Sequence, residues 1–344
     1  MKIAVLFGAN SFEHEISIVS AIALKKILKE ELVYIFCTYD RNFYLIPTDK
    51  ITSKRFSSGE YKKDKKLYIK NGGFYQKTMM SEKKIDFDVV LNVIHGKDGE
   101  DGKIASMLDF FSIPYIGPRN EASTISYNKL FTKLYAKEFR VKTLAYQVIK
   151  NSEPRDMELD YPVIVKPLRL GSSIGISIVH AKDELSYALD TAFEYDDTVL
   201  VEPFIKDIKE YNLAGYKSLK YNFSIIEEPQ KEEFLDFDKK YLDFSRTKRV
   251  NEANLNQGLI ERMQKAFEKL YEPLFGGALV RCDFFVIDNE VYINEINPVP
   301  GSMANYLFDD FNSVILDLAS NLPKQIDVPK TYKYIHHIQA AKGK

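Results

Sequence analysis

Short apolar runs alternate with stretches of helical apolar spacing over the first third of the chain. Residues 2–7 make a mostly apolar run of strand length, and a glycine turn at residues 8–11 precedes the first helical stretch. Repetition of this order is typical of a doubly wound α/β domain with a parallel sheet, which we expect to span residues 1–118. The expected strands are 2–7, 33–39, 87–94 and 113–116, and the expected helices are 16–29 and 103–111.

Strands and helices follow one another less regularly after Gly117-Pro118. We expect a second unit at residues 119–210 and a third at residues 211–344, and we expect the polar tail at 335–344 to be frayed. Residues 229–251 have no regular pattern, and so long a loop in a compact domain is either functional or disordered. The other expected strands are 141–149, 161–166, 176–180, 198–201, 211–216 and 221–227, and the other expected helices are 121–139, 182–193, 254–271 and 303–319.

Residues 281–301 read RCDFFVIDNEVYINEINPVPG and predict two strands joined by a short turn. Alternate residues of a strand point to the same face. Arg281 and Asp283 should therefore share a face of the first strand, and Glu295 and Asn297 a face of the second. Carboxylate and amide oxygens are ligands of the kind that Mg²⁺ takes beside phosphate oxygens. The alternative is a surface hairpin whose charges are merely solvated.

The length of the turn decides whether the two acids of this hairpin meet. A two-residue turn at 288–289 places Asp283 opposite Asn294, whereas a three-residue loop at 288–290 places it opposite Glu295. We predict the three-residue loop, because it brings the acids together and because asparagine tolerates left-handed backbone geometry.

Composition narrows the class of protein. The chain has 344 residues, 45% of them hydrophobic and 28% charged, which suits a folded protein of two or three domains. Its formal net charge of -1 argues against nucleic acid or a membrane as the main partner. Cys37 and Cys282 have no metal-type spacing, and with no signal peptide or membrane span expected, they favour a cytoplasmic protein. The lysine-rich segment 41–85 is expected to be a peripheral hairpin insertion with a solvated face.

Polar loops follow two of the expected strands in the first domain. Glu13, together with His14 and Glu15, stands just before the first helix, where the helix dipole alone would favour a carboxylate. His95 begins a loop with three glycines at residues 95–102, and such a loop permits close approach to a ligand. The GxGxxG pattern of a dinucleotide fold is absent from the first turn.

The second unit carries a candidate nucleotide site. Lys166 closes an expected strand, and the glycine-serine loop 169–175 that follows can fold its N–H groups over phosphates. The alternative is an ordinary hairpin loop. Glu202 closes another strand ahead of apolar residues, an arrangement that suits an adenine, although it is also compatible with a salt-bridged surface residue. Glu210 follows at a distance that suits a ribose hydroxyl.

Taken together, these motifs resemble the ATP-grasp superfamily and, within it, the D-alanine–D-alanine ligase family. The resemblance covers nearly the whole chain. It implies an N-terminal doubly wound α/β domain followed by a two-domain α+β ATP-grasp fold with a mobile omega loop at 229–251. The matching segments are FGANSFEHEIS, NVIHGKDGEDG, YPVIVKPLRLGSSIG, KKYLD and RCDFF…NEINPVPGS.

The resemblance also implies an activity, the joining of two D-alanines through a D-alanyl phosphate at the expense of ATP, for peptidoglycan precursor synthesis. The implied metal ligands are Asp283, Glu295 and Asn297, for two Mg²⁺ or Mn²⁺ ions. Arg281 and the Gly301 N–H are implied to stabilise the oxyanion of the tetrahedral intermediate. The residues implied to bind ATP are Lys129, Lys166, Ser172, Glu202, Phe204, Ile205, Glu210 and Lys240.

Other implied roles concern the amino-acid substrates. Glu13 should bind the first ammonium group and, with Ser172 and Tyr241, close the omega loop over the site. The residues expected near the substrate carboxylates are His95, Ser302 and Tyr306.

Two positions depart from the family's commonest pattern. Pro203 replaces a lysine and removes one backbone N–H beside the adenine, and Tyr306 replaces a serine at the second substrate's carboxylate. The Lys240-Tyr241 pair resembles the members that form dipeptides rather than esters. The alternatives are an ATP-grasp ligase with a different amine acceptor and a non-catalytic nucleotide-binding relative. A homodimer is expected from the resemblance alone.

Overall fold

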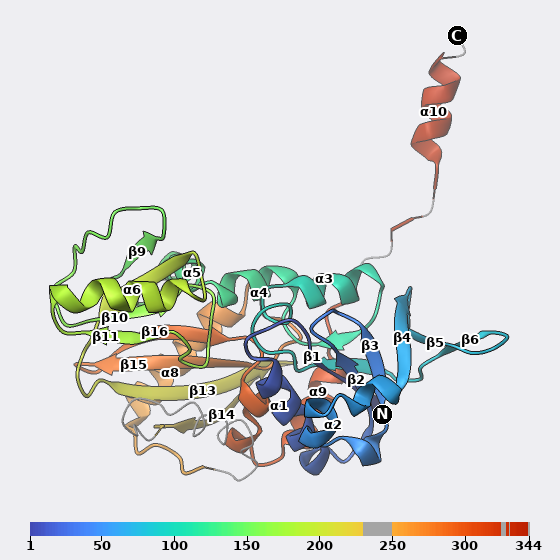
Figure 1. Ribbon diagram of the computed structural model, residues 1–344, viewed down its shortest axis with the longest axis horizontal. Coiled ribbons are helices and arrows are strands. Elements are labelled where there is room, and N and C mark those ends of the chain that lie inside the picture. Colours follow the sequence, from blue (N-terminus) through green and yellow to red (C-terminus); the bar gives the residue numbers. More distant parts are fainter. Residues whose placement is uncertain (230–249, 325–327, 330, 343–344) are drawn as a thin grey trace.

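The computed structural model describes residues 1–229, 250–324, 328–329 and 331–342, and these residues form sheets of eight, four and four strands. Lys240, Tyr241 and nearly all of the predicted omega loop lie outside the described residues. Figure 1 shows the sheets side by side, with the eight-stranded sheet on the right and the two four-stranded sheets on the left. The mixed α/β architecture confirms the predicted fold class.

The first sheet has the order β6-β5-β4-β3-β2-β1-β7-β8. Strands β2, β1, β7 and β8 run parallel, as expected, and antiparallel strands extend the sheet from β2 outward. The lysine-rich segment therefore lengthens the sheet at one edge, where β4, β5 and β6 project in Figure 1. The bounds are β1 Lys2–Gly8, β2 Glu31–Cys37, β3 Phe43–Ile46, β4 Lys65–Lys70, β5 Gly73–Lys77, β6 Glu82–Lys84, β7 Val89–Asn92 and β8 Tyr115–Ile116.

Helices from two distant parts of the chain cover this sheet: three from its first third, and α9 from near its end. Apolar residues of β1 and β2 pack in one core with residues of α1 and α9, so α9, near the end of the chain, is anchored on the first sheet. The helices are α1 His14–Ile27, α2 Ser53–Ser57, α3 Lys103–Phe110 and α9 Phe311–Ser320, with short 3-10 turns η1 Thr48–Lys50 and η2 Glu60–Lys63.

The second sheet is antiparallel and has the order β11-β10-β12-β9. Its strands are β9 Gln147–Lys150, β10 Val163–Pro167, β11 Ser177–Val179 and β12 Thr198–Pro203. The turn η3 Lys182–Glu184 leads into α6 Leu185–Phe193, which packs its apolar face on this sheet.

The single helix predicted at 121–139 is wrong, because the chain breaks into α4 Asn120–Tyr127 and α5 Lys129–Glu138. Asn128 lies at the break, where its side chain accepts hydrogen bonds from the backbone N–H groups of Leu130 and Phe131. An asparagine cap of this kind starts a new helix.

The third sheet has the order β14-β13-β15-β16 and is also antiparallel. Helix α8 packs on one face through residues such as Met263 and Phe267. The elements are β13 Lys209–Lys217, β14 Tyr221–Glu227, α8 Gln257–Tyr271, β15 Val280–Ile287 and β16 Glu290–Asn297.

The hairpin β15–β16 corrects the predicted loop. Its turn has two residues, Asp288 and Asn289, which both have the positive φ that tight hairpin turns favour. The predicted pairing of Asp283 with Glu295 is nevertheless confirmed, because a β-bulge shifts the register between Asp283 and Phe284. Asn294 is the extra residue, so the register change that we assigned to the turn occurs inside the strand.

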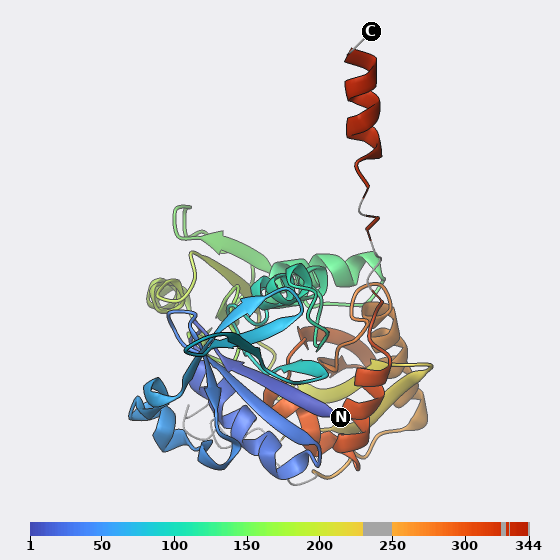
Figure 2. The ribbon, with the colours of Figure 1, turned by 90° about the vertical axis from the view of Figure 1, so that its right-hand side faces the viewer.

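The chain beyond the hairpin also departs from prediction. Instead of one helix at 303–319, the 3-10 segment η4 Gly301–Leu307 contains three left-handed residues, and α9 starts separately at Phe311. The tail expected to be frayed forms a helix, α10 Lys333–Lys342, which Figures 1 and 2 show projecting from the body.

Candidate active site

The loop before α1 and the loop after β10 meet at Glu13. Ser172 Oγ donates a hydrogen bond of 2.5 Å to Glu13 Oε1, and Glu13 is buried. Glycines make room for the carboxylate: a Cβ at Gly96 would lie 2.4 Å from Glu13 Oε2, and one at Gly171 would lie 3.1 Å from Oε1. Burial and the nearby Glu100 raise the pKa of Glu13 to about 7.

His95 joins three segments through a chain of hydrogen bonds. Its Nδ1 lies 2.9 Å from the Val299 carbonyl, which can only accept, so Nδ1 carries the proton and Nε2 is left to accept from Ser20 Oγ at 2.9 Å. Ser20 Oγ in turn accepts the Ser302 N–H at 3.2 Å. Burial lowers the pKa of His95 to about 4, so the ring is neutral at pH 7. Ser20 was not predicted as a site residue, because in the sequence it is only one small residue on the apolar helix α1.

The hairpin β15–β16 presents the predicted acidic group. Arg281 binds Asp283 with two hydrogen bonds, from Nε at 2.7 Å and from Nη2 at 2.8 Å, and Asn297 Nδ2 donates to Asp283 Oδ2 at 2.9 Å. Arg281 Nη1 also donates to the Tyr306 hydroxyl at 3.3 Å. Tyr306, which departs from the family's commonest pattern, thus places its hydroxyl beside Arg281, the residue predicted to stabilise the oxyanion.

Charge at this hairpin favours a cation. Asp283 is buried opposite Glu295, and burial raises the pKa of Asp283 to about 7, with Arg281 opposing and Glu295 adding to the rise. In the described part of the chain, no group of three or more His, Cys, Asp or Glu side chains is arranged to hold a metal by itself. Two carboxylates and one amide nevertheless fit Mg²⁺, which takes few protein ligands and completes its shell with phosphate and water.

Two of the residues predicted to bind the nucleotide, Lys166 and Glu202, come together on the second sheet. Lys166 Nζ lies 2.7 Å from Glu202 Oε2, and Lys133 Nζ lies 2.5 Å from Glu202 Oε1. Burial raises the pKa of Glu202, but the two lysines outweigh it and hold that pKa below its usual value. The interpretation of Glu202 as a surface residue is therefore wrong. Lys133 was missed as a site residue, and its only sequence signal is its position one helical turn after Lys129.

Lys129 lies where the three parts of the site meet. Its ammonium donates to the Leu170 carbonyl in the glycine-serine loop. Burial lowers its pKa, and the opposing charges of Glu295, Glu13 and Glu202 only partly offset this shift. These carboxylates belong to β16, to the loop before α1 and to β12. The site residues that lie far apart in sequence are thus brought within electrostatic reach of one another.

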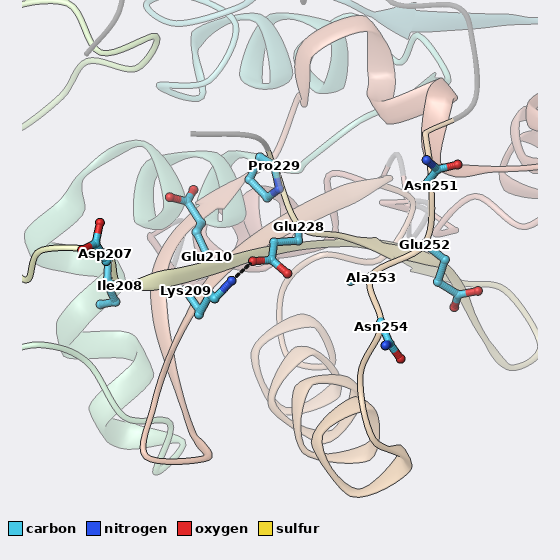
Figure 3. Close-up of a pocket in the computed structure, with 10 residues that line it drawn as sticks. All are labelled: Asp207, Ile208, Lys209, Glu210, Glu228, Pro229, Asn251, Glu252, Ala253 and Asn254. Atoms are coloured by element: carbon cyan, nitrogen blue, oxygen red, sulfur yellow. Dashed lines mark hydrogen bonds and ion pairs between the residues drawn. The ribbon is translucent and has the colours of Figure 1, made fainter. Parts of the chain in front are cut away.

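The proposed adenine segment leads into a hollow beside β13. The Phe204 N–H donates to the Pro162 carbonyl at 2.9 Å, which fixes the chain just after Pro203. A hollow of about 520 Å³ lies next to Glu210. Lys209 and Glu228, which line it, form an ion pair (Figure 3). Its lining residues are Asp207, Ile208, Lys209, Glu210, Glu228, Pro229, Asn251, Glu252, Ala253 and Asn254. Because Pro229 and Asn251 line this hollow, it reaches both ends of the predicted omega loop.

Similarity to known proteins is extensive. Family models described as "D-ala D-ala ligase N-terminus" and "D-ala D-ala ligase C-terminus" match residues 2–118 and 136–311. The D-alanine--D-alanine ligases of Sulfurovum sp. and Campylobacter jejuni subsp. jejuni serotype O:2 are 58% and 53% identical to the chain, each over 100% of both sequences.

Solved structures agree. The D-alanine-D-alanine ligase of Helicobacter pylori has a TM-score of 0.85 at 48% identity, covering 95% of this chain and 100% of its own. The VanG D-Ala:D-Ser ligase of Enterococcus faecalis has a TM-score of 0.74 at 25% identity, covering 93% and 97%. With family models over both parts of the chain and full-length relatives above half identity, this chain belongs to the D-alanine–D-alanine ligase family.

Proposed function

We propose that this chain joins two D-alanines to D-alanyl-D-alanine, with conversion of ATP to ADP and phosphate, for peptidoglycan precursor synthesis. The observation that carries the proposal is the contact between Glu13, in the loop before α1, and Ser172, in the glycine-serine loop. Lys129 donates to the Leu170 carbonyl of the same glycine-serine loop, and His95 ties the first sheet to Val299, just beyond the hairpin β15–β16. One site can therefore hold an amino acid, phosphates and a cation together.

ATP is proposed to lie against the second sheet. Lys129 and Lys166 would bind its phosphates, with Ser172 and Lys240 beside them. Glu202, Phe204 and Ile205 would frame the adenine, and Glu210 the ribose. Since Pro203 has no N–H, the adenine contacts there must come from its neighbours.

The two D-alanines would bind between the first domain and η4. Glu13 would take the first ammonium group and His95 would lie near the first carboxylate. Ser302 and Tyr306 would hold the carboxylate of the second D-alanine, with the Tyr306 hydroxyl standing in for the family's usual serine.

The reaction would proceed in two steps. A carboxylate oxygen of the first D-alanine attacks the γ-phosphorus, forming an acyl phosphate as the bond to ADP breaks. The uncharged amine of the second D-alanine then attacks the acyl carbon, its nitrogen releases a proton, and phosphate leaves from the tetrahedral intermediate. Arg281 and the Gly301 N–H would stabilise the oxyanion, since donors aimed at developing charge lower the barrier.

Two Mg²⁺ or Mn²⁺ ions are proposed at the hairpin, held by Asp283, Glu295 and Asn297. Such ions neutralise charge on the transferring phosphoryl group. The fit rests on the burial of Asp283 opposite Glu295, where a cation relieves the repulsion between the two acids.

Exclusion of water is the proposed role of the contact between Glu13 and Ser172. An acyl phosphate in contact with water would hydrolyse, so the loop after β10 must stay closed during the reaction. Tyr241, outside the described residues, is proposed to complete this closure from the omega loop.

The test of the proposed function is incubation with D-alanine, ATP and Mg²⁺, followed by detection of dipeptide and ADP. Absence of ATP-dependent dipeptide would refute it. A second candidate, ligation to a different acceptor, is raised by the similarity to a D-Ala:D-Ser ligase and by Tyr306. Competition between D-alanine and D-serine as second substrate separates the two.

We further propose a cytoplasmic homodimer, on the strength of the family alone. Within the described part of the chain, no helix combines the length and apolar character needed to cross a bilayer. Light scattering after gel filtration tests the dimer, and a monomer at micromolar concentration would contradict it.

A further inference from the structure

Glu202 holds two lysines that come from different elements. Its Oε2 binds Lys166 on the neighbouring strand β10, and its Oε1 pairs with Lys133 on α5. The side chains of Glu202 and Lys133 are each only 2% exposed, and that of Lys166 is 9% exposed. A carboxylate that is so deeply buried needs a neighbouring cation, because burying it unpaired is strongly unfavourable.

This arrangement creates a competition for Lys166. If Lys166 binds ATP phosphates, its ammonium must share or give up its contact with Glu202. A Glu202 that had no other cation would hold Lys166 back, because losing it would leave a buried charge uncompensated. Lys133 is placed to meet this need, since it occupies the other carboxylate oxygen.

We propose that Lys133 is a positioning residue for ATP: it neutralises Glu202 and so releases Lys166 to the phosphates. The inference rests on the proposed function, because it takes ATP as the substrate and Lys166 as a phosphate ligand. Lys133 is itself fixed in place, with its Nζ 3.5 Å from the Leu144 carbonyl oxygen and 5.3 Å from the centre of the Tyr146 ring.

Direct ATP binding to the full-length protein, measured by calorimetry with Mg²⁺ and without D-alanine, tests this role. Lys133→Met should raise the dissociation constant about tenfold or more, whereas Lys133→Arg, which keeps the charge, should stay within about threefold of wild type. Adenosine, which has no phosphates for Lys166, should bind Lys133→Met within about threefold of wild type. Lys137→Met is the matched control, because Lys137 is an exposed lysine one turn further along α5.

A double mutant separates competition from simple loss of a contact. Glu202→Gln removes the charge that retains Lys166, so adding Lys133→Met to it should change ATP affinity by less than about threefold. A full tenfold loss in the Glu202→Gln background, equal weakening of adenosine, or unchanged ATP binding by Lys133→Met would each overturn the inference. Should Lys133→Met fail to fold, Lys133→Gln replaces it in both comparisons. A wild-type protein that does not bind ATP would overturn the proposed function as well.

Discussion

Ser172 Oγ and Glu13 Oε1 are 2.5 Å apart, although their residues are separated by 159 positions and belong to different sheets' loops. Ser172 reaches this position with a left-handed backbone, at φ 54°. A strained residue is retained where surrounding structure requires it. The contact therefore ties the loop before α1, which is proposed to bind the amino acid, to the loop after β10, which is proposed to bind the phosphates.

Ser172→Ala should loosen this tie while leaving the fold intact. Dipeptide formation should fall by about ten- to hundredfold, as expected for a lost positioning contact. ATP hydrolysed per dipeptide should rise, because water gains access to the acyl phosphate. Parallel assays of ADP and dipeptide measure this ratio. A mutant with wild-type turnover and a ratio of one would contradict the closure role.

The pH dependence of D-alanine use should report Glu13. Since the pKa of Glu13 is raised to about 7, the carboxyl is largely protonated below that pH and ionised above it. Only the ionised form attracts an ammonium group, so kcat/KM for D-alanine should rise as pH increases through about 7 and then level off. Glu13→Gln should remove that rise as well as lowering activity. A rise that persists in Glu13→Gln assigns the titration to another group.

Glu295→Gln tests the metal hairpin. The substitution keeps the shape of the side chain but removes a carboxylate from opposite Asp283, so the fold should persist and the affinity for Mg²⁺ should fall. Turnover at limiting Mg²⁺ should drop by about a hundredfold or more, with partial recovery as Mg²⁺ is raised. Unchanged activity at limiting Mg²⁺ would refute the assignment, and Glu290→Gln, at the exposed start of β16, is the matched control.

Much of this architecture could be predicted from the sequence, because apolar periodicity and motif spacing record which face of an element is buried. The pairing of Asp283 with Glu295 is one success. The three-residue loop predicted to produce this pairing was wrong, because strict alternation of side chains cannot reveal a bulge at Asn294. Lys133 was missed for a similar reason: periodicity places it on a helix, and only packing shows that it reaches a buried carboxylate on β12.

The observed turn carries its own prediction. Asp288 and Asn289 both have positive φ, at 49° and 61°, a conformation that β-branched residues avoid. Asn289→Val should therefore lower the free energy of unfolding by about 1–2 kcal/mol, whereas Asn289→Gly should match or slightly exceed wild type. Chemical denaturation measures both. Equal stability of the valine variant and wild type would speak against this turn.

Tyr306→Phe addresses the second D-alanine. Removing the hydroxyl that lies 3.3 Å from Arg281 Nη1 should raise KM for the second D-alanine by about three- to tenfold, the usual effect of losing one hydrogen bond, with KM for ATP unchanged. Steady-state kinetics with each substrate varied in turn provide the test. An equal rise in both KM values would show a general disturbance of the site instead.

The most direct test of the account remains the reaction itself. Purified protein with D-alanine, ATP and Mg²⁺ should form D-alanyl-D-alanine with about one ADP released per dipeptide, the ratio expected when the acyl phosphate is shielded from water. ADP release without dipeptide, or no ATP consumption when D-alanine is added, would contradict the assignment of this site as a D-alanine–D-alanine ligase.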